Sequence, residues 1–335
     1  MDLHTVAEVV SPAGPGAWRP GDAWLGGGTY LFSEPQPHLR RLVDLGGHGW
    51  EPLRPAPDGG LEIAATCTIA ELAAFAGAPG FTAFHGIATG CCHAFLASFK
   101  IWNVATVGGN LCAALPAGPM ISLTAALDGA CLLLGPDGAA RTVPVADFVT
   151  GDGRTVLRDG ELLRSVHLPA AALTGRTAYR QGSLHTHGRS AALLIGRRDG
   201  DGLILTVTAA TRRPFRLAFP ALPTSEMLQV ALAERIPDEA YQDDVHGLPA
   251  WRRHLTRVYA EQIRQELCQL PAPGPSDGAE NPGELGQLPA PGPSDGAENP
   301  GKLGQLPAPG PSDGAENPGE WRHVRGAARR TRDDP

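Results

Sequence analysis

The sequence has no paired cysteine motif and no long apolar run, and each of these absences excludes a class of protein. Its 6 cysteines include no C-x-x-C pair, so we expect neither an iron–sulfur cluster nor a structural zinc site within the chain. No apolar run approaches the roughly 18 residues of a membrane span. A formal net charge of −7 argues against nucleic acid or an anionic membrane surface as a partner.

The N-terminus also lacks a basic stretch followed by an apolar one, so no secretory signal is expected. Cysteines scattered through a chain without such a signal are typical of a reducing compartment. We therefore expect a cytoplasmic protein whose cysteines are free thiols.

Glycine and proline are abundant instead, with 43 and 32 among the 335 residues, and they are densest near the C-terminus. There the string Leu-Pro-Ala-Pro-Gly-Pro-Ser-Asp-Gly begins at Leu270, Leu288 and Leu306. Each repeat has a single type of large apolar side chain, so it cannot bury a face. We expect residues 269–335 to be a disordered repeat tail, which is either a duplicated linker without function or a docking segment.

The body of the chain is expected to be mixed helix and sheet. Apolar periodicity predicts strands over 42–45, 61–65, 130–135, 141–145, 161–168, 177–181, 191–197 and 203–208, and helices over 121–127, 224–236 and 248–267. Thr68 and Glu71 are spaced as in a capping box. Residues 104–111 are expected to be a glycine-rich loop. In the last helix, one buried stripe is expected, formed by Trp251, Leu255, Val258 and Tyr259 and continued by Ile263 and Leu267.

The first segment with a chemical signature is a run of three glycines. Consecutive glycines leave backbone N–H groups unshielded and permit positive φ angles, as a loop around a pyrophosphate requires. The run lacks the lysine of a P-loop and the spacing of the dinucleotide fingerprint, so an ordinary tight turn is the competing interpretation. The candidate residues are Leu25, Gly26, Gly27, Gly28, Thr29, Tyr30 and Leu31.

A second glycine-rich segment carries the rest of the signature. Its candidate residues are Thr106, Val107, Gly108, Gly109 and Asn110. Together the two segments resemble the FAD-binding medium subunit (or domain) of the molybdenum hydroxylases, which include xanthine dehydrogenases, carbon monoxide dehydrogenases and related aldehyde oxidoreductases. That family reads A-G-G-T-D-L in the first segment and Q-I-R-N-x-A-T-I-G-G-N-L-C in the second.

Further blocks of the same family follow in order over about residues 20–268. They are residues 66–72, 127–148, 160–169, 179–183 and 251–255. The resemblance implies an α+β chain with a two-subdomain FAD-binding fold of the vanillyl-alcohol-oxidase (PCMH) type. The subdomains would be residues 1–57 and 58–173, followed by a small α+β domain over 174–268 and the tail over 269–335.

The resemblance also implies a function. The two segments would hold the pyrophosphate of a non-covalent FAD, Leu163 would lay its backbone against the flavin, and Arg180 would replace a cofactor-facing lysine. The chain would be an electron-transfer subunit without catalytic or metal-ligating residues of its own. It would take electrons from a small [2Fe–2S] subunit, beside a large molybdopterin subunit in a dimer of heterotrimers, and pass them to NAD⁺ or another acceptor.

Several positions depart from the family pattern. Tyr30 replaces an acidic or small polar residue, Trp102 replaces an arginine, and Pro119, Leu184 and His187 replace polar residues. These departures leave the electron acceptor open, and they are compatible with a degenerate copy that binds FAD weakly. The substrate is left open because its pocket would lie in another chain. Two other functions remain as alternatives: a flavin-binding module without turnover, or a stand-alone FAD oxidase. We expect Gly109→Val to damage FAD binding more than Tyr30→Asp or Pro119→Asp, because a β-branched side chain would occupy space needed for the approach to the phosphates and would penalise any positive φ.

Overall fold

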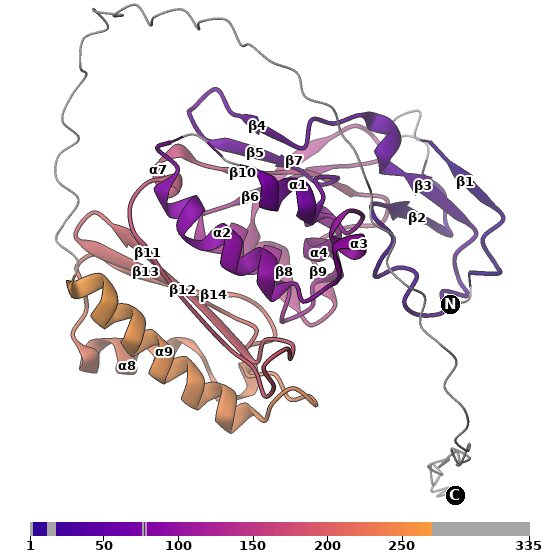
Figure 1. The fold of residues 1–335 in the computed structure, drawn as a ribbon. Helices are drawn as coiled ribbons and strands as arrows, with labels where there is room; N and C mark the ends of the chain where they lie inside the picture. Colours follow the sequence, from indigo (N-terminus) through magenta and orange to yellow (C-terminus); the bar gives the residue numbers. More distant parts are fainter. Residues whose placement is uncertain (1–2, 12–17, 76, 78, 270–335) are drawn as a thin grey trace, which may run out of the picture. The chain divides into compact units, whose positions relative to one another are not determined.

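The computed structural model describes residues 3–11, 18–75, 77 and 79–269. The chain begins with a small parallel sheet of β1 (Glu8–Val10), β2 (Asp22–Leu25) and β3 (Arg41–Asp44), in the order β1-β3-β2. The 3-10 helix η2 (Leu45–His48) follows β3 directly. Parallel strands place their carboxyl ends at one edge, so the residues after β2 and β3 begin side by side (Figure 1).

A five-stranded antiparallel sheet comes next along the chain. Its order is β4-β5-β10-β6-β7, and its strands are β4 (Leu53–Pro55), β5 (Leu61–Ala64), β6 (Ala130–Leu134), β7 (Ala140–Pro144) and β10 (Leu162–Leu168). Strand β10 is central, because Val166 pairs with Ile63 on one side and with Cys131 on the other. The apolar alternation of these strands buries one face against helices.

Helices and one short hairpin connect these strands. They are α1 (Ile69–Ala74), α2 (Thr82–Ala94), α3 (Phe99–Trp102), α4 (Val107–Ala113), α5 (Pro119–Ala126), α6 (Val145–Phe148), β8 (Val149–Gly151), β9 (Arg154–Thr155) and α7 (Ala170–Leu173). Every residue of α5 is buried. Helix α5 therefore belongs to the interior of the chain rather than to its surface.

The C-terminal part is a four-stranded antiparallel sheet with two long helices. Its strands run in the order β11 (Thr177–Gly182), β12 (Ala192–Asp199), β13 (Gly202–Thr208) and β14 (Phe215–Phe219). The helices α8 (Ser225–Arg235) and α9 (Pro249–Gln269) cover one face, while α2 and α5 contact the other (Figure 1). The short 3-10 helix η3 (Asp238–Ala240) lies between α8 and α9 in sequence.

Two hydrophobic cores result, and strand β12 contributes to both. Leu193 and Ile195 belong to the core that contains the five-stranded sheet, while Ala192 and Leu194 belong to the core under α8 and α9. Successive residues of a strand point to opposite faces, so the stretch of β12 from Ala192 to Ile195 is apolar at every position. The C-terminal sheet is thus covered on both sides.

The expected α+β class is confirmed, and so are the capping box of Thr68 and Glu71 and most of the expected strands. Two expectations are wrong. Residues 104–111 are not one loop, because α4 begins at Val107. The buried stripe of α9 consists of Arg252, Thr256, Ala260, Ile263 and Leu267, so the expected stripe is confirmed at Ile263 and Leu267 and wrong in the first half of the helix.

Several elements were not anticipated, among them α2 and strand β14. No helix in the described ranges is long and apolar enough to cross a membrane. The expected repeat tail lies, apart from Gln269, outside the residues that the structure describes.

Candidate functional site

The two glycine-rich segments meet backbone to backbone. A Cβ atom on Gly27 would lie 1.7 Å from the carbonyl oxygen of Val104 and 3.1 Å from the Cα of Ala105. One on Gly26 would lie 3.0 Å from Oγ1 of Thr106. The absence of a side chain at Gly27 is therefore what allows the segments to touch.

The first segment offers unused hydrogen-bond donors. It leaves β2 at the carboxyl edge of the parallel sheet, and Gly28 has a φ of +71°. Within the described part of the chain, the backbone N–H groups of Gly27, Gly28 and Thr29 donate no hydrogen bond. The carbonyl of Gly28 accepts from the N–H of Phe32 at 2.8 Å, which closes the turn. Successive free N–H groups in such a turn form a concave site for an anion.

The second segment, by contrast, has already used its donors. The N–H of Val107 donates to the carbonyl of Cys67 at 2.8 Å, and that of Gly108 donates to Ala65 at 3.0 Å. The N–H of Gly109 donates to Oγ1 of Thr106 at 3.0 Å, so Thr106 caps α4. Gly109 lies in α4 and has no positive φ, so a side chain at this position meets no penalty of that kind.

Asn110 connects the second segment to α5. Its Oδ1 accepts from the N–H of Met120 at 3.0 Å, and a Cβ on Gly118 would lie 3.0 Å from the same oxygen. Pro119 is the first residue of α5, where its missing N–H and fixed φ are favourable. The amide nitrogen of Asn110 has no partner among the described residues and remains a donor.

Leu163 lies beside the second segment, on β10. It is buried in the core, and the pairing of β10 with β6 shifts between Leu163 and Ser165. The bulged residue Arg164 accepts a hydrogen bond from the N–H of Ala65, whose own carbonyl accepts from Gly108. A β-bulge of this kind re-aims the backbone locally, and here it joins β10 to the start of α4.

Arg180 does not lie with these residues. Its guanidinium donates to Oε1 of Gln262 at 3.0 Å and to Oε2 of Glu266 at 2.7 Å, both on α9. Its neighbour Tyr179 points the other way and donates to the carbonyl of Gly90 on α2. Strand alternation thus directs Arg180 away from the side of the sheet that faces α2.

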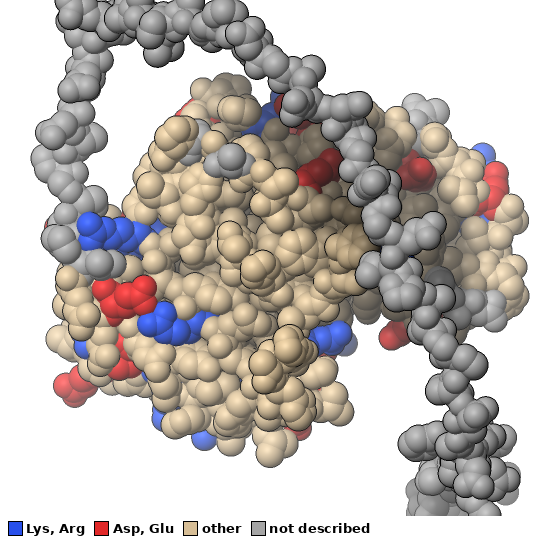
Figure 2. All heavy atoms as spheres, in the orientation of Figure 1, with Lys and Arg blue, Asp and Glu red and all other residues tan. Residues whose placement is uncertain are grey.

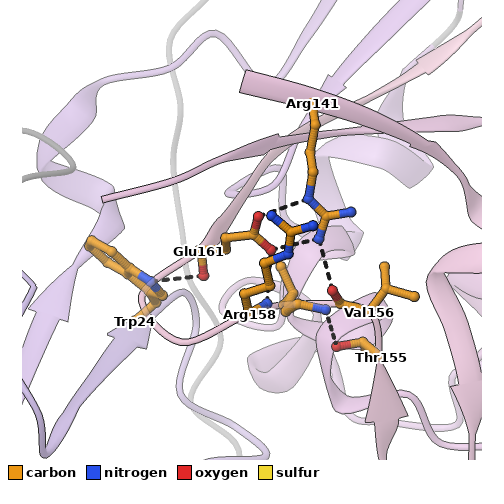
Figure 3. A network of polar contacts seen from close by, with 7 residues as sticks. Trp24, Arg141, Thr155, Val156, Arg158 and Glu161 are labelled. Atoms are coloured by element: carbon orange, nitrogen blue, oxygen red, sulfur yellow. Dashed lines mark hydrogen bonds and ion pairs between the residues drawn. The ribbon is translucent and has the colours of Figure 1, made fainter. Parts of the chain in front are cut away.

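A polar network anchors the strand that carries the first segment (Figure 3). The indole Nε1 of Trp24 on β2 donates to the carbonyl of Glu161 at 3.1 Å. The carboxylate of Glu161 accepts two hydrogen bonds from Arg141, at 2.8 and 2.6 Å, and one from the N–H of Arg158. The Arg141 guanidinium is the main reason that the pKa of Glu161 is lowered to about 2.

Two adjoining cavities lie beyond α4, between the β8–β9 hairpin and the C-terminal part. One has a volume of about 260 Å³ and is lined by residues 115–117, which follow α4, and by Arg252. The other has a volume of about 470 Å³ and is lined by Arg154, Arg212 and Arg213. Asp152 and Gln242 line both. No pattern in the sequence indicates this site. The pair Arg252-Arg253 is typical of a solvated helix face, but that expectation is wrong for Arg252, which is 1% exposed.

The described residues contain no group of three or more His, Cys, Asp and Glu side chains placed to hold a metal ion. All six cysteines are free. Burial raises the pKa of the Cys92 thiol to about 11, so it is not a nucleophile at neutral pH. The arrangement can therefore bind an anionic group at the first segment, but it offers no activated nucleophile.

Comparison with known proteins agrees with this geometry. Residues 19–171 match the family model of the FAD binding domain in molybdopterin dehydrogenase. The xanthine dehydrogenase FAD-binding subunit of Escherichia coli O157:H7 is 31% identical over 151 residues, which cover 43% of this chain and 49% of the relative. Xanthine dehydrogenase 2 of Arabidopsis thaliana is 33% identical over 87 residues, which are 24% of this chain and 6% of that protein. The alignment thus spans about half the length of the bacterial relative.

Solved structures match a larger part of the chain. The carbon monoxide dehydrogenase of Oligotropha carboxidovorans aligns with a TM-score of 0.64 and 24% identity, over 79% of this chain and 99% of that one. Quinoline 2-oxidoreductase from Pseudomonas putida 86 aligns with a TM-score of 0.63 and 20% identity, over 78% and 96%. At these identities the matches show a shared fold.

Proposed function

We propose that the chain, whose residues 19–171 match the family model of the FAD binding domain in molybdopterin dehydrogenase, is the FAD-binding electron-transfer subunit of a molybdenum-containing hydroxylase or dehydrogenase complex. It would take electrons from iron–sulfur clusters of a partner and pass them to NAD⁺ or another acceptor. The observation that carries the proposal is the contact of Gly27 with Val104, which joins the two segments at a row of unused N–H groups.

The residues present fit a non-covalent FAD. Its pyrophosphate would accept hydrogen bonds from the free N–H groups of Gly27, Gly28 and Thr29. No existing hydrogen bond of these groups in the described residues would have to break. The hydroxyl of Thr106 and the amide nitrogen of Asn110 would add donors from the second segment. When bound, FAD supplies the ring that accepts and releases electrons. We retain Leu163 in this site and leave Arg180 out of it, because Arg180 contacts α9.

Partner chains would bring the other cofactors. We propose a small [2Fe–2S] subunit and a large molybdopterin subunit, assembled as a dimer of heterotrimers. A surface suited to a partner lies just before the second segment, where Leu96, Phe99, Ile101 and Val104 are exposed. The face around α2 in Figure 2 likewise carries hardly any charged side chain. Apolar surface of this kind is typical of protein interfaces.

The two cavities would admit the electron acceptor. The guanidinium groups of Arg154 and Arg212 have no hydrogen-bond or ion-pair partner in the described ranges. Unpaired arginines suit phosphate oxygens, so an acceptor with phosphate groups, such as NAD⁺, fits the larger cavity. The smaller cavity is lined by residues 115–117, which lie next to the second segment. The acceptor would approach the flavin there.

The proposal is tested by purifying the chain from its native source under mild conditions. We expect FAD at one per chain, together with molybdenum and iron from partner subunits, measured by the visible spectrum and elemental analysis. A chain that binds no FAD alone or in a complex contradicts the proposal. Flavin alone that oxidises a small alcohol directly indicates a stand-alone oxidase, and flavin without any turnover indicates a binding module. The free thiols suit a reducing compartment, so we propose the cytoplasm.

A further inference from the structure

Arg252 is a buried cation that no part of the FAD site requires. It lies on α9 and is 1% exposed, yet it lines the cavity of about 260 Å³. Its Nε donates to the carbonyl of Gly247 at 2.9 Å, and its Nη1 donates to those of Ala191 at 2.8 Å and Ala209 at 2.7 Å. Its Nη2 pairs with the carboxylate of Asp244.

The segments that Arg252 holds are the walls of that cavity. Ser190 precedes Ala191 and lines it, Ala209 lines it directly, and residues 244–246 form a further wall. Ala209 has a φ of +61°, which is costly for a residue with a side chain, and its N–H donates to the carbonyl of Pro116 at 2.9 Å. Contacts therefore run from Arg252 through Ala209 to the stretch that follows α4.

Only arginine suits this position chemically. Three carbonyls from separate loops converge on one point, and a guanidinium presents five donors in a fixed plane. A lysine would supply a charge but not the fork of donors. Burying a cation is unfavourable unless it is paired and hydrogen-bonded, and Asp244 with the three carbonyls meets that condition.

We propose that Arg252 is a positioning residue for the electron acceptor. It fixes the three loop segments around the cavity, so that the acceptor binds in the cavity at the end that lies next to the proposed flavin site. The inference rests on the proposed function, because it takes the cavity as the acceptor site. It predicts that loosening Arg252 weakens acceptor binding without changing how FAD is held.

Arg197 provides the matched control. It is also buried, pairs with Asp128 and donates to the carbonyl of Ala126 at 3.3 Å. It lines neither cavity. Arg197→Lys should therefore lower the melting temperature, as Arg252→Lys does, without affecting acceptor binding.

The experiment uses the full chain loaded with FAD and reduced anaerobically with dithionite. Reoxidation of the flavin is followed by stopped flow against NAD⁺, against menadione as a quinone, and against ferricyanide, which needs no binding site. One of these two acceptors, NAD⁺ or menadione, is expected to reoxidise the wild type. For that acceptor, we expect the concentration that gives half the limiting rate to be at least about tenfold higher in Arg252→Lys. FAD content, limiting rate and ferricyanide rate should stay within about twofold.

If Arg252→Lys does not fold, Asp244→Ala replaces it in the experiment. This variant removes only the bond between Arg252 and Asp244, so the half-saturating concentration of the acceptor should rise about threefold. An unchanged half-saturating concentration in the variants, or an equal rise in Arg197→Lys, overturns the positioning role alone. A wild type that holds FAD but is reoxidised by neither acceptor overturns the acceptor cavity and this inference with it. A wild type without FAD overturns the proposed function itself.

Discussion

The two glycine-rich segments look alike in sequence but do different work. In the first, Gly27 and Gly28 leave N–H groups free and the turn open. In the second, a Cβ atom on Gly108 would lie 2.5 Å from the Cβ of Ala65. Every backbone N–H from Val107 to Asn110 already donates a hydrogen bond. The first segment keeps its donors available, whereas the second uses its donors for bonds within the chain.

The difference shows why a glycine motif does not by itself identify a phosphate site. Glycine permits close approach of anything, whether a ligand or another backbone. At Gly27 and Gly108 it is a neighbouring backbone that comes close, and only the neighbouring free N–H groups mark the ligand side. The glycines should therefore differ sharply in their response to substitution.

Gly27→Ala should have the largest effect. A methyl group 1.7 Å from the Val104 oxygen must push the segments apart, so we expect FAD affinity to fall at least about a hundredfold, roughly 2.7 kcal/mol. Fluorescence titration with FAD measures this. Gly109→Ala, whose Cβ would meet only Oγ1 of Thr106 at 2.9 Å, should cost less than about tenfold.

Gly80→Ala is the control for both, because nothing lies within 4 Å of its Cβ position. It should bind FAD as the wild type does. If Gly109→Ala proves worse than Gly27→Ala, the contrast between the segments is mistaken and the phosphate lies against α4.

Glu161→Gln should have the second-largest effect, because it weakens the polar network that anchors the strand carrying the first segment. Losing a charged, nearly buried partner of Arg141 should lower the free energy of unfolding by roughly 2–3 kcal/mol. The folded pKa of Glu161 lies below its unfolded value of 4.5. Its contribution is therefore complete above about pH 4.5 and is lost as the pH falls toward 2.

Urea denaturation at neutral pH and at pH 3 checks this prediction. The gap between wild type and Glu161→Gln should narrow in acid. A gap that stays constant across this range would show that the carboxylate charge is not what stabilises the anchor.

Thr106→Ala should have a smaller effect, limited to the cap of α4. The loss of the bond from the Gly109 N–H should cost about 1 kcal/mol of stability and lower FAD affinity, since the hydroxyl is also a proposed donor. Thr224→Ala removes the matching cap of α8, where the hydroxyl accepts from Met227. The two variants should lose similar stability in thermal melts, and only Thr106→Ala should weaken FAD binding.

Arg180→Ala should have the smallest effect on the cofactor. Its guanidinium joins β11 to α9, so FAD affinity should stay within about twofold of the wild type, and stability should fall by up to about 1 kcal/mol. The same titration measures it. A loss of FAD affinity above tenfold would return Arg180 to the cofactor site.

Local sequence patterns predicted the parts of the fold that depend on residues close together in the sequence. The Thr68–Glu71 capping box and most of the strands were predicted, because caps and apolar alternation act over a few residues. Helix α2 was missed, since its glycines, threonines and paired cysteines have low helix propensity. Its Gly86 and Gly90 are explained only by Thr177 and Tyr179 of β11, which would lie 2.4 and 3.3 Å from a Cβ at those positions.

The sequence by itself determined the two glycine segments, the resemblance to FAD-binding domains and the α+β class, since these rest on residue types and their order. The tertiary structure decided which N–H groups stay free, that Arg180 contacts α9, and that Arg252 gathers three loops beside a cavity. Whether a donor is free depends on which carbonyl another part of the chain brings to it. That is a property of contacts between distant residues, and no local pattern contains it.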